Sequence, residues 1–360
     1  MEKNKTLSIG DLTARVPVIQ GGMGVGISLS SLAGNVARCG GVGVLSAAQI
    51  GFRDPEWDRD PVETNLRVLK EEIAKAREIA ASNGIIGVNI MVATRFYERY
   101  VRAAVQAGAD LIISGAGLPV ELPAFVSGSG VKIAPIVSSL KSFQVISKYW
   151  KKKYDVLPDL VVIEGPLAGG HLGFKREELA DIGALSFEEE IKRIIACVRD
   201  MEKGKHIPVA VAGGIYHAAD ARPYFEMGAD AVQAATRFVT TYECDASPCY
   251  KEAYIMAKKE DIEIVSSPVG MPGRAIHNEF LDQVKEKGSL PMEKCHQCLE
   301  KCRQKEIPYC ITDALVQAAR GNVQQGLLFC GANAYKASEL LHVSDIMKEF
   351  EEELTWQQGL

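Results

Sequence analysis

The chain has 360 residues, of which 47% are hydrophobic and 24% are charged, so it can bury one large core or two modest ones. Its 46 acidic and 41 basic residues give a formal net charge of −5 without a long basic block, which argues against nucleic acid or an anionic membrane as a partner. No run approaches the roughly 18 apolar residues of a membrane span, and no secretory signal is evident. We therefore expect a cytoplasmic protein with a small-molecule substrate.

Eight short runs rich in Val and Ile follow one another along the chain. They span 16–20, 41–46, 85–92, 109–115, 132–139, 159–165, 207–214 and 229–238. Segments between them repeat apolar residues at helical spacing, among them 29–39, 65–80, 187–204 and 219–228. Continuous apolar strands indicate burial on both faces, as in a parallel sheet covered by helices. Within the α/β class, eight such units favour a closed (β/α)8 TIM barrel over an open doubly wound sheet.

The alternation of strands and helices weakens beyond about residue 240. We expect residues 1–240 to form the barrel and residues 241–360 to form a smaller, cysteine-rich extension of helices and loops. A helical pattern at 311–321 falls in this second part. The extension is expected to pack on the barrel and to complete its substrate side.

Glycines gather at the predicted ends of several strands, where barrel enzymes place their chemistry. Gly213 and Gly214 end the seventh predicted strand, and Ala235 and Thr236 lie in the eighth. Barrels of this kind often bind phosphate at these two positions through backbone N–H groups. The first loop, QGGMGVG at 20–26, is not a dinucleotide fingerprint and suits a planar ring lying against the backbone. Simple turn formation is the alternative for each of these loops.

The second part of the chain contains a cysteine motif. With no secretory signal, the nine cysteines of the chain are expected to be reduced thiols. Four of them have the spacing C-x2-C-x3-C-x7-C: Cys295, Cys298, Cys302 and Cys310. Four thiolates could hold zinc or an iron–sulfur cluster, although this is not a standard zinc-finger spacing. Free thiols that pack the extension are the alternative, and His296 within the motif is expected to be solvated.

Seven segments together carry a resemblance to a known family: PVIQGGMGVGIS (17–28), GVNIMV (87–92), SGAGLP (114–119), EGPLAGGHLGF (164–174), AGGI (212–215), ATRF (235–238) and SPVGMPGRAI (267–276). They resemble the nitronate monooxygenases, or 2-nitropropane dioxygenase-like flavoproteins, and the related flavin-dependent enoyl-acyl-carrier-protein reductases. The resemblance implies an FMN-binding barrel. It implies a flavin ring along Gln20, Gly21, Gly22 and Met23 with Asn89 at its polar edge, further cofactor contacts from Gly169 and Gly170, and a phosphate held by Gly213, Gly214, Ala235 and Thr236.

The resemblance also implies a reaction. In nitronate monooxygenases an alkyl nitronate is oxidised by dioxygen to a carbonyl compound and nitrite, and His171 would act as base on the neutral nitroalkane. The alternatives are an NAD(P)H-dependent enoyl-acyl-carrier-protein reductase, an NAD(P)H-dependent quinone reductase and a non-enzymatic flavin-binding redox sensor. The element EGPLAGGHLGF departs from the simpler E-A-G-G-H form by an inserted Pro and Leu, so the substrate is left open. The oligomeric state, a homodimer included, is open as well.

His171 stands in an unusual local sequence, because Gly169 and Gly170 precede it and Gly173 follows it. Without neighbouring side chains, its imidazole is expected to be open to the cavity. An ordinary histidine pKa near 6.5 would suit proton transfer at neutral pH. The sequence therefore predicts a catalytic role for His171, with a buried structural histidine as the alternative.

Overall fold

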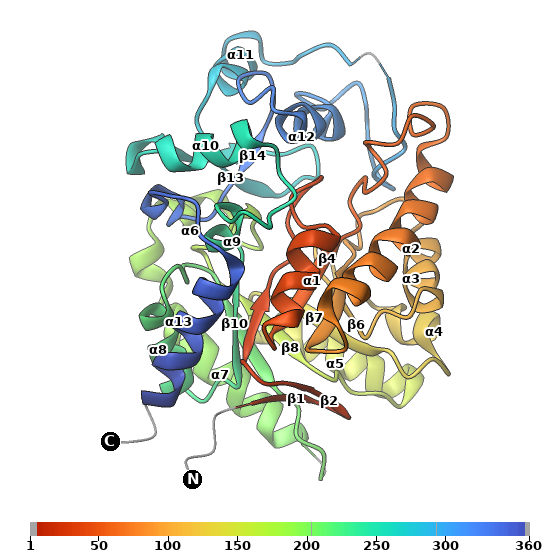
Figure 1. The fold of residues 1–360 in the computed structure, drawn as a ribbon, viewed down its shortest axis with the longest axis vertical. Coiled ribbons are helices and arrows are strands. Elements are labelled where there is room, and N and C mark those ends of the chain that lie inside the picture. Colours follow the sequence, from red (N-terminus) through yellow and green to blue (C-terminus); the bar gives the residue numbers. More distant parts are fainter. Residues whose placement is uncertain (1–5, 203, 293, 357–360) are drawn as a thin grey trace.

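The computed structural model describes residues 6–202, 204–292 and 294–356. Its centre is a closed barrel of parallel strands in the order β10-β11-β3-β4-β5-β6-β7-β8 (Figure 1). The strands are β3 (Val18–Gln20), β4 (Val42–Ser46), β5 (Ile85–Asn89), β6 (Leu111–Ser114), β7 (Lys132–Val137), β8 (Val161–Glu164), β10 (Val209–Ala212) and β11 (Ala231–Ala234). Each lies within one of the predicted runs, so the predicted (β/α)8 barrel is confirmed.

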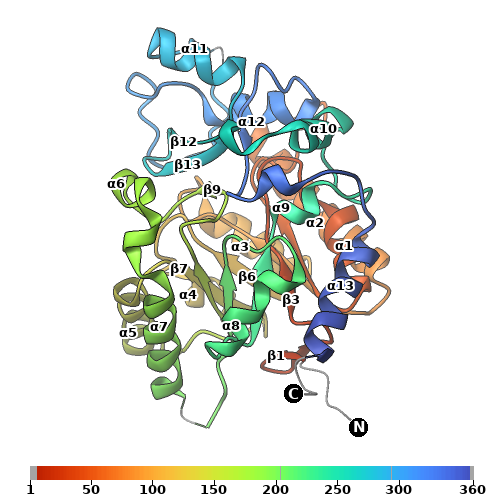
Figure 2. The same ribbon diagram turned by 90° about the vertical axis from the view of Figure 1, so that its left-hand side faces the viewer.

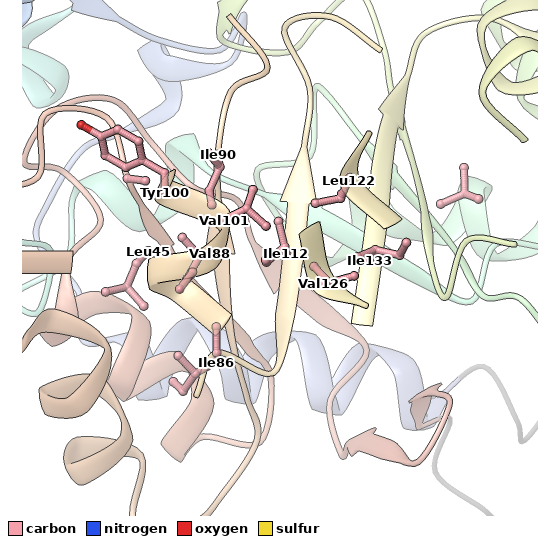
Figure 3. Close-up of a cluster of buried hydrophobic side chains, with 14 of the residues drawn as sticks. Leu45, Ile86, Val88, Ile90, Tyr100, Val101, Ile112, Leu122, Val126 and Ile133 are labelled. Atoms are coloured by element: carbon pink, nitrogen blue, oxygen red, sulfur yellow. The ribbon is translucent and has the colours of Figure 1, made fainter. Parts of the chain in front are cut away.

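A ring of helices surrounds the strands (Figures 1 and 2). It contains α1 (Ser30–Arg38), α2 (Pro61–Ala80), α3 (Tyr97–Gln106), α4 (Leu122–Val126), α5 (Leu140–Tyr154), α7 (Phe187–Met201) and α8 (Arg222–Glu226). The strands bury alternate residues on opposite faces, because successive side chains of a strand point to opposite sides. On β5, Ile85 belongs to the inner core of the barrel, whereas Ile86 and Val88 belong to the layer between strands and helices (Figure 3). This double burial explains the continuous apolar runs in the sequence.

A short hairpin closes one end of the barrel. Its strands are β1 (Leu7–Ile9) and β2 (Leu12–Ala14), which pair antiparallel. Leu7, Ile9 and Ala14 are buried in the same cluster as the inward side chains of the barrel strands. The hairpin thus fills the amino-terminal end of the barrel, and a site can form at the opposite end.

The extension lies over that opposite, carboxyl end of the strands (Figures 1 and 2). Its elements are α10 (Pro248–Met256), β12 (Ile262–Ser266), β13 (Pro272–Ile276), α11 (Glu279–Lys287), α12 (Ile311–Arg320) and β14 (Leu328–Phe329), and α9 (Thr236–Val239) precedes them at the end of the barrel part. Besides the expected helices it contains a small antiparallel sheet in the order β12-β13-β14, and β9 (Gly170–His171) of the barrel part pairs with β13. Short strands that contain Pro and Gly, such as PGRAI in β13, do not show the usual strand pattern.

The last helix, α13 (Val343–Trp356), returns to the barrel wall. Val343, Ile346 and Phe350 are buried in one cluster with Leu32 and Val36 of α1. The Glu349 carboxylate accepts a hydrogen bond of 2.8 Å from the backbone N–H of Ala218, next to α8. This helix therefore packs with the barrel helices, although the sequence groups it with the extension. No helix in the described part of the chain has the length and hydrophobicity to cross a membrane.

Candidate functional site

A cavity of about 390 Å³ lies where the carboxyl ends of the barrel strands meet the extension. Its walls include nearly all residues that the sequence predicts for cofactor binding and catalysis: Gly21, Gly22, Met23, Asn89, Gly169, Gly170, His171, Gly213, Gly214, Ala235 and Thr236. These residues come from several strand ends that are far apart in sequence. The fold thus brings them together around one space.

Gln20 is the exception among the predicted cofactor residues. It is fully buried and does not line the cavity. Its side-chain amide donates a 2.5 Å hydrogen bond to the carbonyl of Gly21 and accepts one of 3.1 Å from the N–H of Val44. Gln20 therefore holds the first loop from behind, because both polar ends of its side chain are engaged inside the barrel wall. Gln233 of β11 lines the cavity in its place, and a polar residue within the apolar run 229–238 was the signal for it.

The loops after β10 and β11 form a cradle of backbone. Gly213 and Gly214 have φ angles of +104° and +82°, a region that favours glycine. A Cβ on Gly213 would lie 3.0 Å from the backbone N of Ala168, and one on Gly214 would lie 2.9 Å from a methyl carbon of Leu167. Side chains are thus excluded, and the backbone is left accessible to a ligand. Such a cradle at the ends of the last two barrel strands fits a phosphate group.

Residues of the extension hydrogen-bond to this cradle. The hydroxyl of Thr236 accepts a 3.0 Å hydrogen bond from the N–H of Gly331, and the side-chain amide of Asn333 donates one of 2.5 Å to the carbonyl of Gly214. Gly331 and Asn333 also line the cavity. The sequence offered no indication of these contacts, because they join residues about a hundred positions apart.

The opposite side of the cavity suits a flat ring. A Cβ on Gly22 would lie 2.5 Å from the Cβ of Asn89, so the chain approaches β5 too closely for any side chain. The Asn89 side chain donates to the carbonyl of Gly22 at 3.4 Å, while its Oδ1 is buried without a partner among the described residues. A buried acceptor without a donor is uncommon in folded proteins. An N–H group of a flavin ring would supply that donor, so the residues present fit FMN.

His171 is placed by the extension. It pairs with Gly273 of β13, its Nε2 lies 2.7 Å from the hydroxyl oxygen of Ser267, and its ring meets Phe329 edge-on at 4.9 Å between centroids. Burial lowers the pKa of His171 to about 4. The expected pKa near 6.5 is therefore wrong, because side chains of the extension enclose the ring that the neighbouring glycines leave open. At neutral pH the imidazole is uncharged.

Arg274 fixes the loop that precedes His171. Its side chain is 4% exposed, and its guanidinium donates to the carbonyls of Pro166, at 2.8 Å, and of Ala168. Gly273, which precedes Arg274 on β13, is the partner of His171 in the sheet. Arg274 therefore ties the glycine loop to β13. This role could not be inferred from the sequence, although Arg274 belongs to one of the segments that carry the family resemblance.

Glu164, at the end of β8, is a second titratable group in the cavity. Burial raises its pKa to about 7. The pKa values of Glu164 and His171 are thus shifted in opposite directions, and each shift favours the uncharged form. Pairs of groups with separated pKa values are typical of sites that move protons.

The four cysteines of the predicted metal motif lie elsewhere, around a second cavity of about 100 Å³. Within residues 6–202, 204–292 and 294–356, no group of three or more His, Cys, Asp or Glu side chains is arranged to hold a metal ion. His296 lines the same cavity and is 6% exposed, so the expectation that it is solvated is wrong. The structure therefore gathers the motif without forming a single-ion site.

Comparison with known proteins matches most of the chain. A family model described as nitronate monooxygenase matches residues 5–353. A probable nitronate monooxygenase from Staphylococcus aureus (strain Newman) is 24% identical over 326 residues, which cover 80% of this chain and 83% of the relative. A probable nitronate monooxygenase from Staphylococcus saprophyticus is 24% identical over 306 residues, with 79% and 82% covered.

Solved structures share the fold. FabK from Thermotoga maritima has a TM-score of 0.70 at 24% identity and covers 96% of both chains. A nitroalkane oxidase from Streptomyces ansochromogenes also has a TM-score of 0.70, at 20% identity, with 95% of this chain and 96% of that chain covered. At these identities the likeness extends to the fold alone. The family match and the cavity that fits FMN together lead to one conclusion: the chain belongs to the nitronate monooxygenase family and is an FMN-dependent oxidoreductase.

Proposed function

We propose that this protein is a nitronate monooxygenase, which converts an alkyl nitronate and dioxygen into a carbonyl compound and nitrite. The observation that carries the proposal is the uncharged His171 beside the glycine cradle that fits FMN, in one cavity. The family match and the probable nitronate monooxygenases among the relatives support the same reaction. Overall, two nitronate anions and one dioxygen give two carbonyl compounds and two nitrite ions, a balance that needs no external reductant.

FMN, when bound, supplies the electron transfer to dioxygen. The protein holds the substrate and manages the proton. An uncharged imidazole can accept a proton at a ring nitrogen, and Nε2 of His171 is held by the hydroxyl of Ser267. A pKa of about 4 makes His171 a weak base, however. We therefore infer that the anionic nitronate, which needs no deprotonation, is turned over faster than the neutral nitroalkane.

The walls of the cavity set the size and polarity of the substrate. Met23, Met271, Leu327 and Phe329 line it together with the polar groups already described. An apolar pocket with few polar groups binds a small alkyl chain and excludes water from the reacting atoms. These walls support a short-chain alkyl nitronate as substrate.

A second candidate function rests on an adjoining cleft of about 1,030 Å³, which shares Ser138, Ser139, Gly173 and Met271 with the flavin cavity. Lys141, Lys175 and Arg176 line this cleft, together with four glutamates. Lysine and arginine side chains beside a cofactor cavity can bind the phosphates of a nicotinamide dinucleotide or of a long acyl thioester. This cleft favours an NAD(P)H-dependent reductase, with enoyl thioesters or quinones as acceptors.

One experiment separates the two candidates. The purified protein is mixed anaerobically with NADH, NADPH or an alkyl nitronate, and the absorbance of the flavin is followed before and after addition of oxygen, a quinone or an enoyl thioester. Nitrite formed from nitronate and oxygen without any nicotinamide supports the monooxygenase. The opposite result would overturn the monooxygenase in favour of the reductase: NAD(P)H bleaches the flavin, only the thioester or quinone reoxidises it, and no nitrite forms.

A further inference from the structure

The second cavity is defined by the cysteine motif. Its volume is about 100 Å³, and its walls include all four motif thiols, His296, Arg95 and Pro268, with Cys310 at the start of α12. The segment that carries Cys295, Cys298 and Cys302 forms neither helix nor extended strand and is held by a few backbone contacts. Four thiols from an irregular segment thus surround one space, which is more than the packing of free cysteines requires.

His296 supplies an independent indication of a ligand. Its ring stacks on Trp57 at 4.1 Å between centroids, and its Nε2 lies 2.9 Å from a carboxylate oxygen of Asp313. Because a carboxylate accepts hydrogen bonds, Nε2 donates to Asp313, and Nδ1 is the ring nitrogen left for another partner. Nδ1 is buried and has no hydrogen-bond partner in the described ranges of the chain. A histidine that donates one ring N–H to a carboxylate and presents its other nitrogen is the usual arrangement next to a metal.

The size of the cavity and the arrangement of its ligand groups distinguish a single ion from a cluster. A zinc ion, with Zn–S bonds of about 2.3 Å, would bring four thiolates to within about 3.8 Å of one another. No three ligand-type side chains in the described part of the chain are arranged to hold a single ion. The cavity is also far larger than one ion, since a volume of about 10–15 Å³ already accommodates a water molecule. Four thiols that line a volume of this size suit several irons bridged by sulfide.

We propose that Cys295, Cys298, Cys302 and Cys310 bind an iron–sulfur cluster, with the imidazole of His296 beside it. The site does not depend on the reaction proposed above, because none of these residues lines the flavin cavity.

The cysteine cavity lies next to segments that also border the flavin cavity. The carbonyl of Cys298 accepts a 3.1 Å hydrogen bond from the N–H of Arg95, and the N–H of Glu300 donates one of 3.0 Å to the carbonyl of Ala93. Both contacts join the motif to the loop after β5, the strand that ends at Asn89. On another side, Pro268 follows Ser267, the partner of His171. An iron–sulfur cluster here would therefore stand beside the loop after β5 and the segment that carries Ser267.

The test is the metal and sulfide content of the protein purified without oxygen, or reconstituted with ferrous iron and sulfide. We expect equal amounts of iron and acid-labile sulfide, about two or four of each per chain, and an electron paramagnetic resonance signal on dithionite reduction. The double variant Cys298→Ser, Cys302→Ser should lose most of both while keeping FMN. The matched control is Cys249→Ser, which changes an exposed cysteine outside the motif and should keep the full content.

Other outcomes would overturn the proposal. Zinc without sulfide in the wild-type protein would show a single-ion site, and neither metal nor sulfide after reconstitution would leave four packing thiols. A third variant, His296→Ala, should keep the iron and sulfide content but change the shape of the resonance signal. The reason is that a ring nitrogen beside the cluster alters the electronic environment of the irons. If the double variant does not fold, the wild-type analysis alone still decides between the outcomes. If the wild-type protein binds no FMN, that result counts against the flavin site and not against the cluster.

Discussion

The flavin cavity and the cysteine cavity differ in what forms their walls. The flavin cavity is lined largely by glycine backbone at the ends of barrel strands, such as Gly22, Gly213 and Gly214. The cysteine cavity is lined by side chains of an irregular segment. Hydrogen bonds between barrel strands fix the first without any ligand, whereas few backbone contacts fix the second. We infer that the barrel creates the flavin site, whereas a ligand would complete the cysteine site.

Removal of His171 tests the chemistry of the flavin cavity and has the largest expected effect. General-base catalysis typically contributes about 10²- to 10⁴-fold, so His171→Ala should slow the turnover of neutral nitroalkane by up to that factor and keep FMN bound. Nitronate turnover should fall much less, because the substrate is already deprotonated. Steady-state rates on both substrates give the ratio of the two losses.

The exposed His277 offers the matched control, since His277→Ala removes an imidazole from the extension outside the flavin cavity. Its rates on both substrates should stay close to those of the parent. Equal losses on nitroalkane and nitronate in the His171 variant would mean that His171 positions the substrate or flavin and is not the base.

A methyl group on the phosphate cradle should have the next largest effect. Gly214→Ala places a Cβ 2.9 Å from the side chain of Leu167, at a position with φ of +82°. Loss of one hydrogen bond to a charged group costs about 1.5–3 kcal/mol, so we expect the FMN dissociation constant to rise by about 10- to 150-fold. Fluorescence titration of the apoprotein with FMN measures it.

Gly130→Ala is the control for backbone strain. Gly130 has a similar φ of +76°, but no described atom lies within 4 Å of the point where its Cβ would stand, and it is remote from the cavity walls. Both variants should lose the stability that a left-handed alanine costs, the Gly214 variant somewhat more because of Leu167, and only the Gly214 variant should lose FMN affinity. Parallel affinity losses in the two would mean that general destabilisation, and not the cradle, controls FMN binding.

The sequence located residues in the wall of the flavin cavity where their position follows from a strand end. Gly213 and Gly214 could be located because a buried apolar run stops there, and the barrel then fixes where that end lies. Gln20 was misplaced because strand alternation leaves open which face of the first strand meets the cavity. The pKa of His171 could not be predicted, since the residues that bury it, Ser267 and Phe329, are distant in sequence.

The extension was less predictable for a related reason. Its sheet consists of short strands, and β13 contains Pro, Gly and Arg in place of an apolar alternation. The contact between Arg274 and the loop at 166–168 joins parts of the chain about a hundred residues apart. Such long-range contacts leave no periodic pattern along the chain. The cysteine spacing was visible, but the partners of His296 were not.

Glu164 allows a smaller, pH-dependent test of burial in the flavin cavity. Its pKa is raised to about 7 in the folded protein, from an ordinary value of 4.5 in the unfolded chain. Between these values the folded state retains a proton that the unfolded state releases, so the free energy of unfolding decreases as pH rises from about 4.5 to 7. Glu164→Gln removes this loss and should raise the Tm of the apoprotein by a few degrees above pH 7, with little change near pH 4.5.

Thermal unfolding of the apoprotein at a series of pH values provides the measurement. The exposed Glu177 serves as the control, because Glu177→Gln changes an exposed carboxylate of the adjoining cleft and should change the Tm little. A constant difference between Glu164→Gln and the parent across the pH range would show that the carboxyl is not buried as the structure indicates.

The smallest expected effect is at Ser267, which lies between the two cavities. Its Oγ accepts a hydrogen bond from the N–H of Val269 at 3.3 Å and can also accept the Nε2–H of His171 at 2.7 Å, which leaves the Nδ1 lone pair of the uncharged imidazole for proton transfer. A hydrogen bond of this kind is worth about 0.5–1.5 kcal/mol net, so Ser267→Ala should lower kcat/KM on nitronate by about 2- to 12-fold. An accepting hydroxyl stabilises the charged imidazolium more than the uncharged ring, so its removal should also lower the pKa of His171, and the acidic limb of the rate profile should move to lower pH. The neighbouring Ser266→Ala should do neither, since the Ser266 hydroxyl meets the guanidinium of Arg176 at 3.4 Å and not the imidazole. A loss of rate with an unmoved pH profile would mean that Ser267 supports the extension and not the imidazole.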